Sequence, residues 1–379
     1  MKYDASLKKT LFYILLLCSP ILYATTIEKI STLDFVQKFP NVTLLHSSGK
    51  IHFDFGKHPL SDIPQPYTIE TAGFFLDSFI LTIPQGTVQL GSSEYYPFVN
   101  GYFISEMQLR FEKPELYNDL KNISAPQETI NINGRVAVIT NIWAFCYYHW
   151  INDVVSKLAL LELHGIEYDY LYIPQYKPFM KETLNLWGID PNKIIPATLN
   201  MQIQATEIII PTNISSISSN IILGCYMQNT ILHHIRTKLL SNIPTLSNHK
   251  FSQKVYISRK DAGNKRQVFN EDEIFELLQT KGFQRYCLSN MSVADQIALY
   301  HHATDIISVH GAGLTNIIFC KPQTRIIEIF QTHYDVMYWA LSQMLDLNYQ
   351  YINAIDGNVL FNPLHQGTSI SLDLIRKTI

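Results

Sequence analysis

The sequence predicts an α/β protein built from two strand–helix units that face each other across a cleft. From residue 135 onward, short apolar runs rich in Val and Ile alternate with segments of helical spacing, which indicates parallel sheets with right-handed crossovers. The polar, proline-containing stretch 241–253 divides this region and predicts a linker. We therefore expect a first unit at residues 135–245 and a second at 246–379, preceded by a β-rich region at 25–134.

Residues 1–24 predict a signal peptide or a signal anchor. Three lysines precede the apolar run Leu11–Tyr23, and Ala24 offers a small residue at a cleavage position. The run is short for a full membrane span, and its flanking charges suit either outcome. We therefore expect a protein of the secretory pathway, the periplasm or the extracellular space, held to a membrane only where this segment is retained as an anchor.

The charge balance argues against nucleic acid as a partner. The 379 residues include 29 Lys and Arg against 32 Asp and Glu, a formal net charge of -3, and no long basic run occurs. A nucleic-acid-binding surface would need clustered positive charge to neutralise phosphates.

The five cysteines show no metal-binding spacing. Cys18 lies in the leader, and the other four are compatible with two disulfides in an oxidising compartment or with buried free thiols. The chain also carries four acceptor sequons for N-glycosylation, about as many as chance would produce in a chain this rich in Asn, Ser and Thr. They begin at Asn41, Asn122, Asn213 and Asn290.

The region 25–134 is β-rich and irregular. The runs Thr68–Phe75, Phe79–Ile83 and Val88–Leu90 consist of β-forming residues bounded by Pro, Gly and Asp, a pattern typical of short strands. We expect a small β subdomain or an elaboration of the first unit. Three histidines recur at six-residue intervals, a spacing that fits surface or strand-end positions better than a metal site. They are His46, His52 and His58.

In the first unit, Arg135–Thr140 predicts a strand, and His149–Leu163 has the apolar spacing of a helix. The alternation continues as far as the linker. It predicts strands at Tyr168–Ile173, Lys193–Pro196 and Thr206–Pro211, and helices at Phe179–Trp187 and Gln228–Leu240.

The second unit shows the alternation more clearly. Ser292 is expected to cap a helix, with Asp295 three residues later completing a capping box. The predicted strands are Lys254–Ser258, Gln284–Leu288, Asp305–Val309 and Arg325–Phe330, and the predicted helices are Glu271–Thr280, Ser292–Ala303 and Asp335–Leu345.

The segment after the strand Asp305–Val309 is expected to bind an anion. A glycine-containing turn follows the strand, and an apolar helix is expected to open near Gly313. Uncovered backbone N–H groups and the positive end of a helix dipole would together hold a phosphate or diphosphate. His310 stands at the strand end, where ligand sites of open α/β sheets lie.

Two other interpretations of this turn stay open. The run Gly311-Ala312-Gly313-Leu314-Thr315-Asn316 approaches a dinucleotide-binding fingerprint, but Asn316 replaces the third glycine and the unit lies in the last quarter of the chain. A tight turn without a ligand is the second alternative.

Three further side chains could belong to a nucleotide site. Arg259 and Arg266 follow the strand Lys254–Ser258, and arginine holds phosphate oxygens in bidentate geometry; a solvated basic loop is the alternative. Glu328 lies in an apolar strand and could accept both hydroxyls of a ribose, or form a salt bridge to Arg325 or another base.

The segment Tyr147–Asp153 carries the candidates for proton transfer. His149 and Asp153 are four residues apart and therefore lie on one face of a helix. Either group could remove a proton from an acceptor hydroxyl. The alternative makes Asp153 a favourable first-turn carboxylate, with His149 and Trp150 as packing residues.

Five segments together resemble glycosyltransferase family 61. They are Cys146–Trp150 with Asp153, Lys157 and Leu158; Val255–Ala262; Asn270–Glu273; Gly282–Phe283; and His310–Asn316. The resemblance covers roughly residues 130–353. It implies a GT-B fold, in which two Rossmann-like domains face across a cleft, and inverting transfer from a nucleotide sugar without an essential metal. It places the donor on Arg259, Arg266, His310, the run Gly311 to Asn316, and Glu328, and the acceptor beside His149–Asp153.

The sequence thus predicts an inverting glycosyltransferase with a nucleotide sugar, a UDP-sugar favoured, as donor and a glycan or protein hydroxyl as acceptor. Asp153, helped by His149, would act as the base, and Arg259 with the glycine turn would stabilise the leaving diphosphate. No metal site is expected, because no Asp-x-Asp motif stands in a suitable position. Two other classes stay open: a catalytically silent nucleotide- or carbohydrate-binding protein and a nucleotide-sugar epimerase.

Overall fold

The computed structural model describes most of the chain from residue 25 onward. The described residues are 25–26, 28–48, 51–54, 72–75, 78–90, 97–104, 122–123, 126–141, 143–174, 177–198, 201–212, 227–243, 251–261, 266–331, 335–354 and 367–379. The expected leader 1–24, most of the linker, Cys225 and the sequon at Asn213 lie outside them. Within the described ranges, no helix has the length and apolar character needed to cross a membrane.

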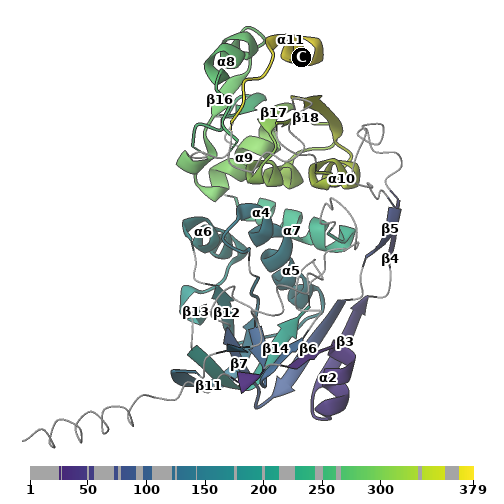
Figure 1. Ribbon diagram of the computed structural model, residues 1–379, viewed down its shortest axis with the longest axis vertical. Helices are drawn as coiled ribbons and strands as arrows, with labels where there is room; N and C mark the ends of the chain where they lie inside the picture. The colour runs from purple at the N-terminus through teal and green to yellow at the C-terminus, as the bar shows by residue number, and fades with distance from the viewer. Residues whose placement is uncertain are drawn as a thin grey trace, which may run out of the picture.

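A mixed sheet forms the lower part of the molecule in Figure 1. Its centre is four parallel strands in the order β13-β12-β11-β14. Their bounds are Glu128–Val138 (β11), Tyr170–Pro174 (β12), Ile194–Ala197 (β13) and Met201–Pro211 (β14). This order corresponds to strands 3-2-1-4 of the dinucleotide-binding fold, whose topological switch point lies between strands 1 and 4, here β11 and β14.

The N-terminal strands extend this sheet. β6 (Ser78–Pro84) and β7 (Thr87–Leu90) both pair antiparallel with β14, each along a different half. β3 (Thr43–Ser48) continues from β6, and β8 (Pro97–Val99), β9 (Tyr102–Ile104) and β2 (Glu28–Ile30) continue from β7. Two short antiparallel pairs stand apart: β1 (Thr25–Thr26) with β10 (Asn122–Ile123), and β4 (Ile51–Asp54) with β5 (Ala72–Phe75). The expected strands at 79–83 and 88–90 are therefore confirmed, and they lie in the sheet of the first unit.

The helix expected at His149–Leu163 begins two residues early and contains a wide turn. α4 (Tyr147–His149), the π-helical turn η3 (Trp150–Val155) and α5 (Ser156–Leu163) follow one another without a break. All six residues of η3 are buried. Single π-helical turns are rare and concentrate at functional sites, and this one carries Asp153. The other helices here are α2 (Thr32–Lys38), α6 (Pro178–Trp187), the 3-10 turn η4 (Pro191–Lys193) and α7 (Asn229–Ser241).

A second, parallel sheet forms the upper part of the molecule (Figure 1). Its order is β16-β15-β17-β18-β19, with bounds Lys254–Ile257 (β15), Gln284–Tyr286 (β16), Asp305–Val309 (β17), Arg325–Phe330 (β18) and Asn348–Asn353 (β19). The sheet grows from β15 in one direction to β16 and in the other to β17, so its switch point lies between β15 and β17. Ligands of such sheets bind outside the carboxyl ends of the strands at this point.

The helices of the second unit follow the predicted order, with one correction. They are α8 (Glu271–Gln279), the 3-10 turn η5 (Leu288–Asn290), α9 (Val293–His302), the 3-10 helix η6 (Ala312–Phe319), α10 (Met337–Met344) and α11 (Leu372–Thr378). The helix expected near Gly313 is η6, a 3-10 helix rather than an α-helix. Its hydrogen bonds are poorer than those of an α-helix, so the expected dipole contribution to anion binding is smaller.

Two glycines at this turn are required for space rather than for backbone freedom. Gly311 has φ 165°, an extended conformation that any residue adopts. A Cβ at Gly311 would lie 2.8 Å from Nη1 of Arg259, and one at Gly313 would lie 2.8 Å from Cδ1 of Leu288. Both side chains therefore approach the backbone more closely than a larger residue would allow.

Helices fill the space between the two sheets, and one apolar core crosses from unit to unit. α4 to α7 lie on the side of the first sheet that faces the second unit, and α9 and α10 lie opposite them (Figure 1). Trp150 and Ile231 of the first unit belong to the same buried cluster as Ile297 and Phe319 of the second. Separate clusters cover the outer faces, with Phe35 of α2 on the first sheet and Ile375 of α11 on the second.

α9 begins as predicted and receives a contact from the first unit. Ser292 Oγ accepts the Asp295 backbone N–H at 3.1 Å, which confirms the cap. The Asp295 carboxylate accepts in turn from the Ser292 hydroxyl at 3.0 Å. The Val293 N–H donates to Oε2 of Glu182 in α6 at 2.6 Å. A carboxylate at a helix N-terminus is favourable, so this contact helps hold the units together.

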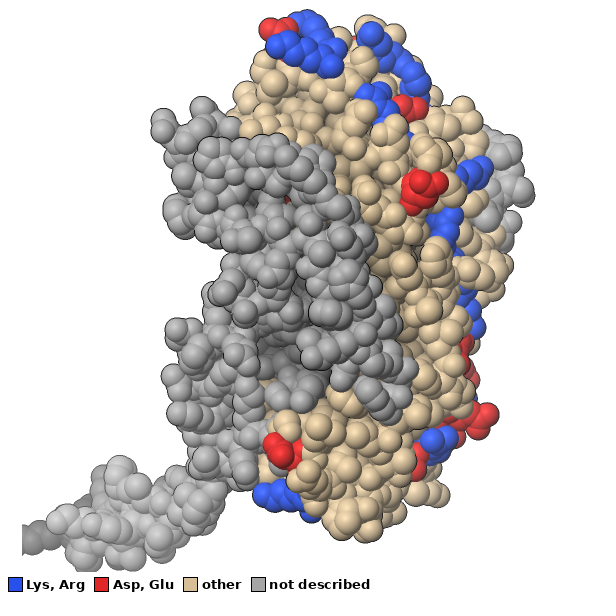
Figure 2. Space-filling model, turned by 90° about the vertical axis from the view of Figure 1, so that its right-hand side faces the viewer, with Lys and Arg blue, Asp and Glu red and all other residues tan. Residues whose placement is uncertain are grey.

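Figure 2 shows most charged side chains of this face at its top and along its right-hand edge. Lys and Arg gather at the top, over the second unit, and side chains of both signs occur along the edge.

Candidate functional site

Arg259 and His310 follow the carboxyl ends of β15 and β17, the two strands of the second switch point. Ile257 pairs with Ser308, so the loops that leave these strands start side by side. The Arg259 guanidinium packs on the backbone of Gly311, with Nη1 2.8 Å from the position that a Cβ would take. The structure thus brings Arg259 and the glycine turn together, as the sequence predicts.

Arg266 joins this group from the loop before α8. Its Nη1 donates to the His310 carbonyl at 2.8 Å, and its Nε is buried without an acceptor in the described part of the chain. Arg266 has φ 52°, a left-handed conformation that costs roughly 1–2 kcal/mol. Burial lowers the pKa of both guanidinium groups, and Arg266 lowers that of Arg259 further. Two like charges in a partly desolvated place favour an anionic ligand.

Side chains orient the peptide groups of the glycine turn. Arg266 donates to the carbonyl of His310, and the Tyr338 hydroxyl donates to the carbonyl of Gly311 at 2.7 Å. Because a trans peptide points its C=O and its N–H in opposite directions, these bonds turn the N–H groups of Gly311 and Ala312 away from the two donors. Fixed N–H groups are what an anion-binding turn requires.

A buried chain of hydrogen bonds holds His310. Its Nδ1 lies 2.5 Å from Oε1 of Glu328, and the Tyr349 hydroxyl donates to Oε2 at 2.6 Å. The sequence predicted that Glu328 accepts ribose hydroxyls. Glu328 is instead fully buried, so its carboxyl group orients His310 and is not presented to a ribose. The alternative was a salt bridge to Arg325 or another base. Arg325 is not the partner, because its guanidinium donates to Oε1 of Gln350 at 2.8 Å, and the basic partner of Glu328 is His310.

Burial favours the neutral forms of this pair. Desolvation raises the pKa of Glu328 from 4.5 to about 8. Desolvation lowers the pKa of His310 from 6.5 to about 3, and Arg266 and Arg259 add to that shift. With the carboxyl protonated, its proton lies in the hydrogen bond to Nδ1, and Nε2 carries the imidazole proton. This tautomer directs a hydrogen-bond donor to the side of the ring away from Glu328.

These shifts predict that stability falls on the alkaline side of pH 6.5. Glu328 binds its proton more tightly when folded, so its contribution is complete below pH 4.5 and is lost as pH rises through 8. His310 binds its proton less tightly when folded, so its contribution is complete above pH 6.5 and is lost as pH falls through 3. Between pH 4.5 and 6.5 the two residues change the free energy of unfolding in opposite directions as pH rises. From pH 6.5 to 8 only Glu328 changes it, and the change is a loss of stability.

Calorimetry of the wild type should therefore show Tm falling between pH 6.5 and 8. The Glu328→Gln variant carries no titrating group at this position and should lose that fall. Equal slopes in the two proteins would contradict the raised pKa of Glu328.

The π-helical turn of the first unit brings His149 and Asp153 together. Nδ1 of His149 lies 2.7 Å from Oδ2 of Asp153, and Asn152 Nδ2 donates to Oδ1 at 2.7 Å. The Asp153 side chain is 0% exposed and that of His149 is 19% exposed, so the imidazole is the accessible member. Behind them, buried Lys157 donates to the Thr140 carbonyl at 2.8 Å. Burial lowers the pKa of Lys157 to about 8, opposed by the nearby Asp153.

The two motifs meet where the units pack together. Ring contacts run from His149 to Tyr148, from Tyr148 to Tyr338, and from Tyr338 to His310, with centroid separations of 5.2, 6.0 and 5.5 Å. Residues far apart in sequence and placed at the carboxyl edges of two sheets thus border one region.

The last residues of the predicted turn face the interior. Leu314, Thr315 and Asn316 are buried. The Asn316 amide accepts from the Tyr147 hydroxyl at 2.8 Å and donates to Oε1 of Gln296 at 3.0 Å. Asn316 therefore ties the first unit to the second and is not presented to a ligand. The partly exposed positions of the turn are Ala312 and Gly313.

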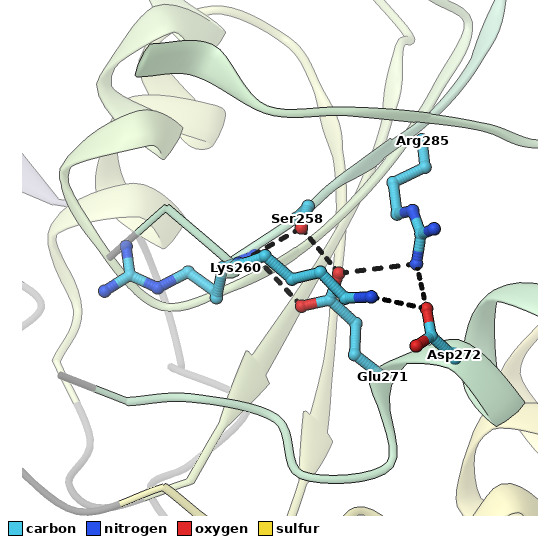
Figure 3. A network of polar contacts seen from close by, with 6 residues as sticks. Ser258, Lys260, Glu271, Asp272 and Arg285 are labelled. Carbon is cyan, nitrogen blue, oxygen red and sulfur yellow. Dashed lines mark hydrogen bonds and ion pairs between the residues drawn. The ribbon is translucent and has the colours of Figure 1, made fainter. Parts of the chain in front are cut away.

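Glu271, to which the sequence interpretation assigned no role, holds the loop of Arg259 (Figure 3). Its buried carboxylate accepts from the Ser258 hydroxyl at 2.5 Å and from the Arg259 backbone N–H at 3.1 Å. Arg285 lies 3.8 Å from Glu271 and donates to Asp272 at 2.6 Å. Three acidic residues stand in a row from 271 to 273, and nothing in their spacing tells which one is buried.

The described cysteines are free thiols. Cys146 and Cys287 are half-buried and Cys320 is buried. Among the residues that the structure describes, no group of three or more His, Cys, Asp or Glu is placed to hold a metal ion.

Residues 147–327 match the family described as Glycosyltransferase 61. A β-1,2-xylosyltransferase of Arabidopsis thaliana is 31% identical over 101 residues, which are 23% of this chain and 19% of that protein. The β-1,2-xylosyltransferase RCN11 of Oryza sativa subsp. japonica is 29% identical over 93 residues, 22% and 17% of the two chains. An EGF domain-specific O-linked N-acetylglucosamine transferase of Drosophila melanogaster is 29% identical over 98 residues, 25% and 18%.

The similarity thus spans less than a fifth of each relative's length. The family match covers His149, Asp153 and His310 of the two His-carboxylate pairs and ends one residue before Glu328. Residues 147–327, a little under half of the chain, are thus similar to the glycosyltransferase 61 family.

Proposed function

We propose that this protein is an inverting glycosyltransferase, which moves a sugar from a nucleotide sugar to a hydroxyl of a glycan or protein acceptor. The observation that carries the proposal is the meeting of two carboxyl edges. At the carboxyl edge of the second sheet, the largely buried Arg259 and Arg266 lie beside the fixed glycine turn. Near the carboxyl edge of the first sheet, the accessible His149 is backed by the buried carboxylate of Asp153. The two Rossmann-like units would then form a GT-B enzyme.

In this proposal the donor diphosphate lies on the second unit. Arg259 and Arg266 supply two positive charges, and the N–H groups of Gly311 and Ala312 add oriented donors. His310 Nε2–H is a further donor, kept in this tautomer by Glu328. The arginine pair would balance the diphosphate charge without a metal ion. A UDP-sugar is the favoured donor.

The acceptor hydroxyl lies beside His149, which acts as the base. The sequence interpretation gave this role to Asp153 with help from His149, and the burial of Asp153 reverses the two roles. With Nδ1 donating its proton to Asp153, Nε2 carries a lone pair directed away from the carboxylate. Asp153 then stabilises the imidazolium that forms, as the acid does in a Ser-His-Asp triad.

Transfer proceeds in one displacement. The acceptor proton moves to Nε2 of His149 while the acceptor oxygen forms a bond to the anomeric carbon. The bond from that carbon to the phosphate oxygen breaks, and its electron pair stays on the diphosphate. Preset positive groups around the leaving oxygens stabilise this charge as it develops. A single displacement inverts the anomeric configuration.

The relatives support sugar transfer as the reaction class. Two are named as β-1,2-xylosyltransferases and one as an O-linked N-acetylglucosamine transferase. The predicted leader favours an enzyme that meets its acceptor in the secretory pathway or the periplasm.

The decisive test measures nucleotide release. The purified chain is incubated with UDP-, GDP- and CMP-sugars, with and without a mixture of glycan acceptors, and free nucleotide is followed with time. We expect free UDP from one UDP-sugar and faster release with acceptor. A converted sugar nucleotide without free nucleotide would indicate an epimerase. Binding without any release would indicate a silent binding protein, and either result would overturn the proposal.

A further inference from the structure

Two consecutive tyrosines precede His149 in α4, and they contact opposite ends of the glycine turn. Tyr147 does so directly, and Tyr148 does so through Tyr338. From this we propose that Tyr147 is a positioning residue, which together with Asn316 fixes the place of His149 relative to the donor diphosphate. The inference rests on the proposed function, because it takes His149 as the base and the glycine turn as the diphosphate site.

The Tyr147 hydroxyl holds the last residue of the turn. It donates to Oδ1 of Asn316 at 2.8 Å, and Nδ2 of the same amide donates to Oε1 of Gln296 at 3.0 Å. Gln296 Nε2 in turn donates to the Leu288 carbonyl at 3.0 Å, so the direction of both amides is fixed by their partners. Burial, and to a smaller degree the charge of Glu182, raises the pKa of Tyr147. Its hydroxyl therefore keeps its proton and remains a donor.

Tyr148 contacts the first residue of the turn through Tyr338. The two rings meet edge to face with centroids 6.0 Å apart, and the Tyr338 hydroxyl donates to the Gly311 carbonyl at 2.7 Å. Tyr148 also packs edge to face on the His149 imidazole, with a centroid separation of 5.2 Å. The proposed base thus directly follows two side chains that join α4 to both ends of the turn.

The beginning of α4 depends on such contacts. This helix spans three residues, and the side chain of Cys146 at its N-cap makes no capping bond. Short helices are stabilised mainly by tertiary packing. Displacement needs the reacting atoms about 3–3.5 Å apart, and a misplacement of about 1 Å can cost about 10²-fold in rate. A shift of α4 against the turn should therefore lower kcat and leave the donor site itself unchanged.

Tyr147→Phe removes the hydroxyl and keeps the ring. We expect kcat for transfer to fall about 10- to 100-fold, while calorimetry gives a dissociation constant for UDP within about twofold of that of the wild type. Asn316→Ala should lower kcat similarly. The double variant should lose no more than the larger single loss, because the two residues act through one hydrogen bond. Tyr338→Phe frees the Gly311 carbonyl inside the donor site and should instead weaken UDP binding.

Arg236→Gln is the matched control. Arg236 Nη1 in α7 donates to the Ile318 carbonyl of η6 at 2.5 Å, so this residue also joins the two units, but through a different helix of the first unit. Its replacement should lower Tm and leave both kcat and UDP binding unchanged. The comparison separates the placement of His149 from the general stability of the contact between the units.

Hydrogen exchange of the full chain without ligand tests the attachment independently of activity. In Tyr147→Phe, peptides that cover α4 and peptides that cover the glycine turn should both exchange faster than in the wild type. In Arg236→Gln, peptides that cover α4 should exchange at the wild-type rate.

Three results would overturn the inference: a Tyr147→Phe variant that keeps more than half of the wild-type kcat, UDP binding that weakens as much as kcat falls, or unchanged exchange of α4. Any of them, combined with normal nucleotide release by the wild type, removes the role of Tyr147 and keeps the transferase. A wild type that releases no nucleotide from any sugar overturns the proposed function itself, and with it the catalytic purpose of the attachment.

Discussion

Replacement of His149 by Ala is expected to lower kcat for sugar transfer by about 10²- to 10⁴-fold, the usual contribution of a positioned general base. The loss should fall on kcat, because the acceptor hydroxyl then has no group to take its proton in the transition state. Steady-state kinetics with the donor and acceptor found in the nucleotide-release assay measure it. A variant with more than half of the wild-type kcat would remove His149 from the mechanism.

Asp153→Asn is the matched variant. The amide nearly keeps the size of the carboxylate but cannot stabilise an imidazolium through its charge, and it can hold the ring in the wrong tautomer. We expect strong loss of transfer with donor binding retained, since Asp153 lies on the first unit. Full activity of Asp153→Asn beside an inactive His149→Ala would show that the histidine acts without its carboxylate.

Replacement of Arg259 by Ala is expected to lower kcat/KM for the nucleotide sugar by about 10²- to 10³-fold, the scale seen when one preset donor to a developing anion is removed. Arg259→Lys should recover only part of the loss, because an ammonium cannot reproduce the planar fork of a guanidinium. Donor titrations of kcat/KM and calorimetric binding of UDP measure the effect.

Two further variants separate geometry from charge. Gly311→Ala keeps every charge but places a methyl group 2.8 Å from Nη1 of Arg259. It should displace the guanidinium and lower kcat/KM for the nucleotide sugar, as Arg259→Ala does. Arg376→Ala removes a positive charge from the surface pair with Asp373 and should have no effect. Equal losses in Arg376→Ala and Arg259→Ala would mean that net charge alone is responsible.

The strand–helix order could be predicted because local patterns encode it. Short runs of Val and Ile bounded by Gly and Pro mark buried parallel strands, and β15, β17 and β18 lie within a residue of the predicted bounds. The chain also shows which residues follow strand ends. This was enough to place Arg259, Arg266 and His310 in one candidate site.

The polar roles could not be predicted, because they depend on burial. Glu328 and Asp153 look like available carboxylates in sequence, but both are closed in by partners from elsewhere in the fold. Tyr338 and Tyr349, which complete the site, are two of 22 tyrosines, and their helical or strand spacing is that of ordinary core residues. η6 packs against α9 and α10, contacts that its sequence alone does not reveal.

The position of β11 has a consequence for domain exchange between relatives. The family match begins at residue 147, after β11 has ended at Val138. β11 is nevertheless the central strand on which β12 and β14 pair. A chimera that exchanged only the similar segment would transplant β12, β13 and β14 without β11, and the main-chain hydrogen bonds of β12 and β14 to β11 would have to form on a foreign strand. The segment that is similar in sequence is therefore shorter than the segment needed to form the sheet.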